Sequence, residues 1–431
     1  MSGTFPESPE SAPLNRRPAS VTTPAEAPAL RRTLSLSLLT FYGLGTIIGA
    51  GIYVLIGKIA GVAGLYTPVA FLIAAAAAFL TAFTYAELSA RFPKSAGEAL
   101  YVARGFDKRQ LSIAVGLMVV ASGLISAATI ANGFVGYLNV FADVPRPVAI
   151  AALVIALGAL AVWGIAESVM VATASTIIEV AGLLVIIVVC GDSLAELPHR
   201  APALVPPAQA ETWHAILLGA FLAFYAFIGF EDMVNVAEEA RNPVRDMPRA
   251  ILIATAVATG LYILLALIAV LAIAPAELAA SDAPLALLYE RATGKPAVFI
   301  SLIGVFAVVN GALIQIIMAA RVLYGMSREG WIPAPFGVVH RRTRTPLLAT
   351  GVVAGTVLVL ALALPLIELA RATSFVILLV FVLVNLALLR LKLRGVAPPA
   401  GAWRCPVWVP AAGAAVSLGL LAAQAAAFVS T

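Results

Sequence analysis

The stretch Gly43-Leu44-Gly45-Thr46-Ile47-Ile48-Gly49-Ala50-Gly51 lies within the first long apolar run and carries four glycines in nine residues. Glycine loses more backbone freedom on ordering than any other residue and costs about 1 kcal/mol relative to alanine inside a helix. We interpret the stretch as a break in a membrane-crossing helix, where exposed backbone binds a small zwitterion. Helix packing is the open alternative, because Gly45 and Gly49 also form a GxxxG face.

Composition indicates that the chain is a multi-pass membrane protein. Of its 431 residues 62% are hydrophobic and 11% are charged, whereas soluble domains have roughly 45–50% apolar and 25% charged residues. The net charge of +5 is explained by basic cytoplasmic loops, so no nucleic-acid partner is expected. Cys190 and Cys405 are far apart and the three histidines are scattered, so neither a metal site nor a cofactor is expected.

Apolar runs of spanning length predict about eleven transmembrane helices. They cover approximately residues 35–58, 68–90, 111–141, 147–163, 169–190, 214–237, 250–274, 297–326, 347–364, 368–391 and 405–429. A short surface helix is expected over 283–293. Residues 1–33 are polar and rich in Pro, Ser and Ala, which predicts a disordered cytoplasmic tail rather than a signal peptide.

The basic residues predict the orientation of these spans. With the N-terminus inside, 20 of the 27 Lys and Arg residues fall in inner segments and six in outer ones. Cytoplasmic loops carry the excess of Lys and Arg in multi-pass proteins. We therefore expect a cytoplasmic N-terminus in the cell (inner) membrane.

The sixth span contains a second interruption. Gly229 is followed by the adjacent carboxylates Glu231 and Asp232, and a charge at helix centre costs roughly 2.5–3.5 kcal/mol on insertion scales. Charged groups inside a membrane normally face a cavity or form an ion pair. An alternative interpretation is that the two carboxylates lie at the cytoplasmic end of the span and are hydrated there. Breaks five spans apart are the pattern of two inverted five-helix repeats with a site between them. There, freed N–H groups favour a carboxylate and freed carbonyls accept an ammonium.

Glu179 lies at the centre of the fifth span without an acidic neighbour. An unpaired carboxyl in a medium of low dielectric constant tends to hold its proton, which suits proton coupling. A neutral structural Glu bonded to a neighbouring helix is equally open. Asn132, Asn310 and Gln315 are candidates for the site wall or, more simply, for interhelical hydrogen bonds.

Four stretches carry a resemblance to a known family. They are GLGTIIGAGIYVLIG (43–57), YAELSARFPKSAGEALY (85–101), FYAFIGFEDMVNVAEEARNPVRDMP (224–248) and ARVLYGMSREGWIP (320–333). With them the sequence resembles the amino acid–polyamine–organocation superfamily, in particular bacterial homologues of cationic amino acid transporters. The resemblance implies a five-plus-five inverted-repeat core over residues 34–395 with broken helices 1 and 6, followed by an additional helix in 396–431.

The resemblance also implies site residues. Substrate binding falls on Ile47, Gly49, Ala50, Gly51, Tyr225, Ile228 and Gly229, and coupling or gating on Glu179, Glu231 and Tyr225 as a lid. Proton-coupled relatives often carry a lysine in span five where this chain has Gly182. Sodium-coupled relatives use a Ser/Thr pair on span eight, where the only hydroxyl between Asn310 and Met326 is Tyr324, so no sodium site is expected.

We therefore expect an all-α polytopic membrane protein that moves amino acids across the cytoplasmic membrane as a secondary active transporter. Alternating access, a neutral amino acid, and proton coupling or exchange are expected. The alternative is transport or antiport of cationic amino acids or polyamines. A receptor that binds without transport stays open. An enzyme is not expected, because the spans carry neither clustered metal-binding carboxylates nor a histidine away from their ends.

Overall fold

The chain forms helices almost throughout its described part. This computed structural model describes residues 32–94, 97–163, 169–343 and 345–430; the side chains of 50, 169–172 and 428–430 also lie outside the described part. The helices are α1 (Leu36–Ala63), α2 (Thr67–Arg91), α3 (Gly97–Phe106), α4 (Arg109–Leu138), α5 (Arg146–Trp163), α6 (Val169–Val189), α7 (Leu197–Leu204), α8 (Ala210–Phe224), α9 (Pro243–Ala272), α10 (Pro275–Ala280), α11 (Pro284–Thr293), α12 (Val298–Arg328), α13 (Leu347–Ala363), α14 (Leu366–Leu393) and α15 (Trp408–Ser430). Short 3-10 segments are η1 (Gly64–Tyr66), η3 (Gly191–Glu196), η4 (Tyr225–Phe227), η5 (Glu231–Glu239) and η6 (Ala334–Gly337).

The chain is an all-α, multi-pass membrane protein. By length and hydropathy its described residues contain eight spanning segments, or nine if the bent pair Thr173–Val189 and Gly191–Leu204 is one span. One of the eight, Leu36–Arg91, contains both α1 and α2. Helix α13 is a further apolar helix of 17 residues. Each of the eleven predicted spans therefore falls on a helix. Lipid offers the backbone no hydrogen-bond partners, which is why every apolar run is helical.

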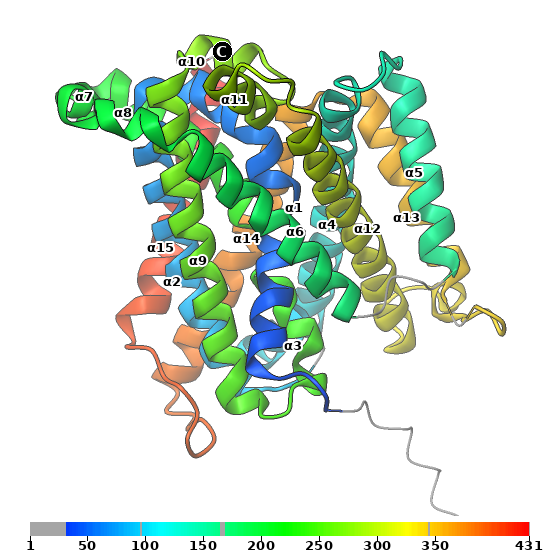
Figure 1. Cartoon of the computed structure of the whole chain (residues 1–431). Coiled ribbons are helices and arrows are strands. Elements are labelled where there is room, and N and C mark those ends of the chain that lie inside the picture. The colour runs from blue at the N-terminus through cyan, green and yellow to red at the C-terminus, as the bar shows by residue number, and fades with distance from the viewer. Residues whose placement is uncertain (1–31, 95–96, 164–168, 344, 431) are drawn as a thin grey trace, which may run out of the picture. The chain divides into compact units, whose positions relative to one another are not determined.

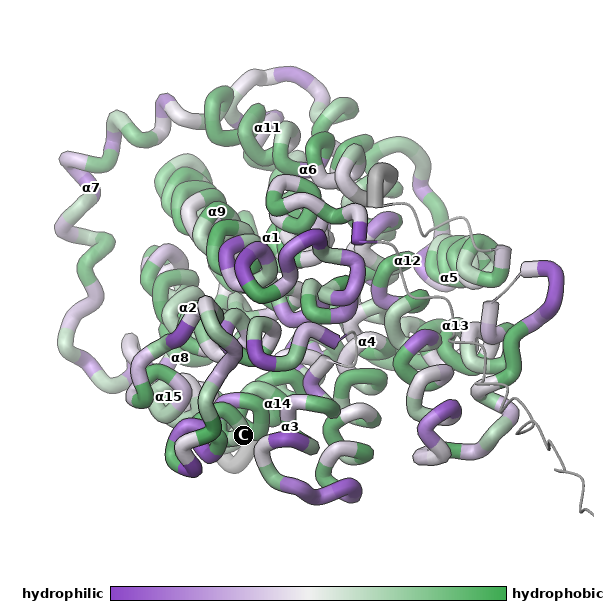
Figure 2. Tube along the Cα trace, turned by 90° about the horizontal axis from the view of Figure 1, so that it is seen from below, coloured by the Kyte–Doolittle hydropathy of each residue, from purple (hydrophilic) through white to green (hydrophobic). Residues whose placement is uncertain are grey.

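The first helix lies among the others rather than at the edge. It contacts α9, α6, α8, α10 and α12, and the view from the α3 end shows α1 surrounded by neighbouring helices (Figure 2). The helices α5 and α13 pack together at one edge of the bundle, and α15 packs on α14, α2 and α8 (Figure 1). The predicted surface helix over 283–293 corresponds to α11, while α3, α7 and α10 were not expected.

The glycine-rich stretch does interrupt α1. Ser35 caps its start by accepting the Leu38 N–H at 3.4 Å, and Gly49 departs from helical geometry with φ −2° and ψ −141°. Gly51 is a point of close approach, because a β-carbon there would lie 2.7 Å from Ala226 Cα. The predicted break is therefore at Gly49. The alternative, packing through Gly45 and Gly49, holds for Gly45 alone: a β-carbon there would collide with Thr176 Oγ1, whereas no atom lies within 4 Å of a β-carbon at Gly49.

The sixth span is broken more extensively than predicted. Helix α8 ends at Phe224, one 3-10 turn follows, Ile228 is extended, and the chain continues as the 3-10 segment η5. Gly229 has φ +127°, a conformation that side chains rarely adopt, and a β-carbon there would collide with the Thr46 carbonyl oxygen. Backbone N–H donors of Leu34 and Arg241 pair with carbonyls of Glu239 and Leu34, so the start of α1 is tied to the end of η5.

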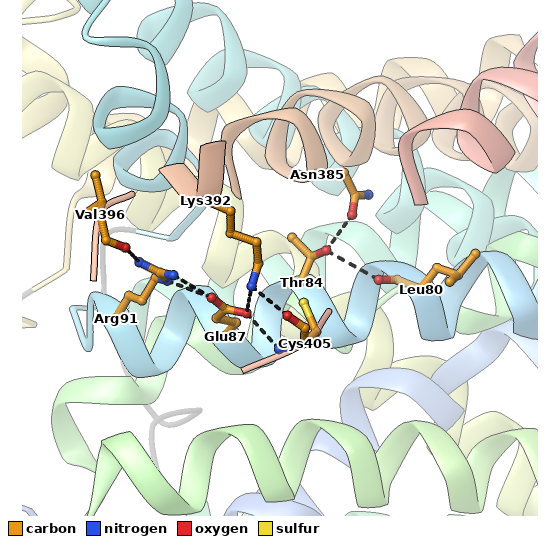
Figure 3. A network of polar contacts seen from close by, with 8 residues as sticks. All are labelled: Leu80, Thr84, Glu87, Arg91, Asn385, Lys392, Val396 and Cys405. Atoms are coloured by element: carbon orange, nitrogen blue, oxygen red, sulfur yellow. Dashed lines mark hydrogen bonds and ion pairs between the residues drawn. The ribbon is translucent and has the colours of Figure 1, made fainter. Parts of the chain in front are cut away.

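A buried polar network connects α2 to the segment that precedes the last helix, α15 (Figure 3). The fully buried Glu87 carboxylate of α2 accepts Arg91 Nη2 at 2.7 Å, Lys392 Nζ at 2.6 Å and the Cys405 N–H at 2.8 Å. Lys392 also donates to the Cys405 carbonyl at 2.7 Å, and Arg91 donates to the Val396 carbonyl at 2.6 Å. Because buried charges need full pairing, these contacts hold the connection between α14 and α15 on α2.

Candidate functional site

A cavity lies between the two helix breaks. It holds about 390 Å³ of space between atoms, including the part open to solvent. Its lining residues are Gly45, Thr46, Ile47, Gly49 and Gly51 of α1, Ser126 and Ile130 of α4, Tyr225 and Ile228 of the sixth span, and Gly311, Ile314 and Gln315 of α12. None of these twelve residues is charged. The cavity therefore offers backbone, two hydroxyls from α1 and α4, one phenol, one amide and aliphatic walls.

The α1 side of the cavity comes from the break itself. Ile47, Gly49 and Gly51 all line the cavity, as the sequence predicted for binding residues, whereas the Ala50 side chain lies outside the described part. The Ile47 carbonyl accepts the Tyr262 hydroxyl at 2.9 Å. Gly51 also packs against Ala226, so it joins the two breaks as well as lining the cavity.

On the side of the sixth span, Tyr225 and Ile228 line the cavity but Gly229 does not. The Tyr225 hydroxyl shares a hydrogen bond with the Ser126 hydroxyl at 3.0 Å, which places its ring across the space between the sixth span and α4. The Gly229 N–H is taken by Glu231 Oε2 at 2.8 Å. Gly229 thus shapes the break, while its neighbours reach the cavity.

The acidic pair of the sixth span lies behind the cavity wall. Asp232 Oδ2 accepts Gln315 Nε2 at 3.3 Å, so one amide separates this carboxylate from the cavity. Glu98 of α3 is near enough to act electrostatically on both Glu231 and Asp232, and its Oε1 accepts the Tyr85 hydroxyl at 3.1 Å. Burial raises the pKa of Glu98 to about 7. Nothing in the local sequence around Glu98 indicates that this side chain is buried near the acidic pair of the sixth span.

Glu179 is also outside the cavity lining. Its Oε1 accepts Asn310 Nδ2 at 3.0 Å, and its Oε2 is buried without a hydrogen-bond partner among the described residues. A β-carbon at Gly182 would lie 2.7 Å from Ile303 Cγ2 and 2.9 Å from Tyr53 Oη. That position therefore has no room for a lysine, in agreement with the departure noted in the sequence.

Comparison with known proteins settles the family. The amino acid permease family model matches residues 33–431. The chain belongs to the amino acid permease family. This confirms the resemblance to the amino acid–polyamine–organocation superfamily, and the family implies that the substrate is a small molecule of the amino acid class.

Individual relatives are named for two substrate classes. The permease is 29% identical over 400 residues to the branched-chain amino acid permease BcaP of Bacillus subtilis, covering 88% of this chain and 84% of that one. It is 30% identical over 396 residues to cationic amino acid transporter 4 of Mus musculus, covering 86% of this chain and 61% of that one. It is 30% identical over 401 residues to an uncharacterised transporter of Mycobacterium bovis, covering 90% and 89%. The permease thus spans about three fifths of the mouse transporter's length.

Several cavity residues of the permease escaped sequence reasoning. Ser126, Ile130, Gly311 and Ile314 are ordinary members of apolar helices, and no local pattern distinguishes them from lipid-facing positions. Asn132, in contrast, is interhelical, because its side chain bonds to Arg146 and to the Ala361 carbonyl. Among the described residues, no three His, Cys, Asp or Glu side chains gather in a way that could hold a metal ion.

Proposed function

We propose that the permease is a secondary active transporter of neutral, aliphatic amino acids, working by alternating access, and not an enzyme. One observation carries the proposal: an uncharged cavity lies between two helix breaks and has aliphatic walls. The breaks supply backbone N–H groups and carbonyls of the kind that bind the carboxylate and ammonium shared by all α-amino acids. The remaining walls select the side chain.

The aliphatic walls support the choice of substrate class. Ile130, Ile228 and Ile314 come from three different segments and all line the cavity. A buried aliphatic wall rejects a charged side chain because removing that charge from water costs several kcal/mol. The name of the Bacillus subtilis relative agrees with this choice.

A cationic amino acid is the second candidate, and a specific contact favours it. Gln315 lines the cavity and its amide donates to Asp232. If Gln315 turned aside, Asp232 would become accessible to a guanidinium or ammonium group. The names of several relatives also point to cationic substrates.

Proton coupling or exchange is proposed over sodium coupling. Glu179 and Glu231 are buried carboxyls close to the two breaks, each with a hydrogen bond to the chain. On α12, the stretch from Asn310 to Met326 offers Tyr324 as its sole hydroxyl. The Ser/Thr pair that sodium-coupled relatives use on this span is therefore missing from the stretch.

The proposed location is the cell (inner) membrane, with the N-terminus in the cytoplasm. The support is the excess of Lys and Arg in the segments on that side. A cytoplasmic tail (1–33), a ten-helix inverted-repeat core (34–395) and an additional helix (396–431) remain the proposed organisation. The α3 end would then face the cytoplasm.

Transport assays in proteoliposomes test these proposals together. Radiolabelled alanine, leucine, arginine and putrescine are offered under a proton gradient, a sodium gradient, or preloaded internal amino acid. Concentrative leucine or alanine uptake under the proton gradient is expected. Uptake only with preloaded amino acid would identify an exchanger. Uptake of arginine or putrescine alone would replace the neutral substrate by the cationic one, and binding without flux would indicate a receptor.

A further inference from the structure

The connection between α14 and α15 is held on α2 by contacts that the proposed transport does not use. Lys392 Nζ donates to the Cys405 carbonyl at 2.7 Å, and the Cys405 N–H donates to the Glu87 carboxylate at 2.8 Å (Figure 3). The Trp403 ring stacks on Phe83 of α2, with ring centroids 5.6 Å apart and an interplanar angle of 14°. Together these contacts fix the chain on both sides of position 404.

Arg404 is exposed between these two anchored neighbours. Cys405 is buried, whereas the Arg404 side chain makes no hydrogen bond or ion pair with the described part of the chain. Two other basic side chains near the connection, Lys392 and Arg394, each pair with a carboxylate. Arg404 is therefore a cation whose main chain is held in place and whose charge has no acceptor among the described residues.

The position of Arg404 along the chain places it at the membrane surface. Helix α15 begins at Trp408, and Trp408–Ala427 is long and apolar enough to span a membrane. Arg404 precedes that start by four residues. The side chains of Val407 and Trp408 are 49% and 62% exposed. Tryptophan is enriched where lipid meets water, because its ring is apolar and its N–H is polar.

We propose that Arg404, Val407 and Trp408 form a binding site for an anionic phospholipid of the bilayer. A guanidinium binds a phosphate through charge-assisted hydrogen bonds, which can be bidentate. The two apolar side chains would contact the glycerol backbone and the first carbons of the acyl chains. The site thus combines one cation with an apolar surface, as an amphiphile with an anionic head requires.

The anchoring of the connection favours binding. A site whose main chain is already ordered loses less conformational freedom when the ligand arrives. One arginine near a phospholipid headgroup corresponds to about a 5-fold change in affinity. The inference concerns the bilayer and not the substrate, so it does not depend on which amino acid the permease carries.

Native mass spectrometry of the purified permease in detergent, titrated with dioleoyl phosphatidylglycerol or dioleoyl phosphatidylcholine, tests the inference. The unaltered permease is expected to bind its first phosphatidylglycerol about 5-fold more tightly than its first phosphatidylcholine. Arg404→Gln should bind both lipids with the weaker affinity. Trp408→Ala should weaken the binding of both lipids and keep their ratio. Soluble glycerol phosphate should not compete, because it lacks acyl chains.

Arg342→Gln is the matched control, because it removes another exposed arginine, in the connection before α13. It should keep the preference for phosphatidylglycerol. All three variants should melt as the unaltered permease does, since each replaces an exposed side chain. A preference that persists in Arg404→Gln, or none in the unaltered permease, would overturn the inference. Competition by glycerol phosphate would replace the lipid by a soluble anion. Each of these outcomes leaves the proposed amino acid transport standing.

Discussion

At the residue scale, two glycines have different structural roles at the two helix breaks. Gly229 is required by its positive φ and by its contact with the Thr46 carbonyl, and it lies outside the cavity. Gly51 lines the cavity and also packs so closely against Ala226 that its α-carbon can carry only hydrogen there. A side chain at Gly51 would push the two breaks apart, since backbone atoms cannot give way as a flexible side chain can.

Gly51→Val should therefore abolish amino acid uptake while the protein still inserts into the membrane. Gly260→Val is the control, because Gly260 is exposed on α9 with no atom within 4 Å of a β-carbon. Uptake per amount of membrane-inserted protein is the measurement. Normal uptake by Gly51→Val would contradict a cavity built on this contact.

The burial of Glu98 leads to a separate prediction about how the stability of the folded protein depends on pH. Burial raises its pKa in the folded chain to about 7 from the ordinary 4.5, so between these values the folded chain binds more protons than the unfolded chain. Stability therefore falls as the pH rises from about 4.5 to about 7, by roughly 3 kcal/mol at most from this group. Glu98→Gln should flatten that fall in thermal unfolding curves of the purified protein. An unchanged pH profile would show that Glu98 is not buried as described.

At the element scale, the final helix depends on a carboxylate from α2. Glu87 is fully buried and accepts bonds from two cations and one backbone N–H. Replacing it by Gln would leave Arg91 and Lys392 buried without a counter-charge. Removal of one partner from a buried ion pair costs about 3–5 kcal/mol.

Glu87→Gln should consequently lower the melting temperature strongly and expose the 394–407 connection to protease. The matched control is Glu368→Gln, which breaks the partly exposed pair with Arg371 on α14. Such surface pairs contribute about 0–1 kcal/mol, so this variant should melt almost as the unaltered protein does. Equal losses in both variants would contradict the anchoring role of Glu87.

At the scale of the whole molecule, alternating access requires the cavity to open to each side in turn. Cys190 and Cys405 are both buried, which favours a low labelling background. Ser126→Cys places a thiol in the cavity and should react with a membrane-impermeant thiol reagent applied from either side. Leucine should protect it. Reaction from one side only, whatever gradient or substrate is applied, would contradict alternating access.

Much of the architecture follows from local patterns. The glycines of α1, the interruption at Gly229 and the apolar runs each report a local backbone property, so the breaks and helices were predictable. The long 3-10 segment that follows Gly229 was not predictable, because its geometry is set by packing on α1, α2 and α9. Helix α3 was missed because ten residues between two spans carry too little periodicity to separate a helix from a loop.

The sequence alone determined a multi-pass helical membrane protein with two interrupted spans, because hydropathy and glycine content act on each segment independently. The family resemblance predicted Ile47, Gly49, Gly51, Tyr225 and Ile228 as binding residues, and the tertiary structure brings these five together at one cavity. Only the tertiary structure decided that Ser126 and three further α4 and α12 residues complete the wall, and that Tyr262 holds the Ile47 carbonyl. Contacts between helices far apart in the chain depend on rotation and depth of each helix, which no single segment encodes.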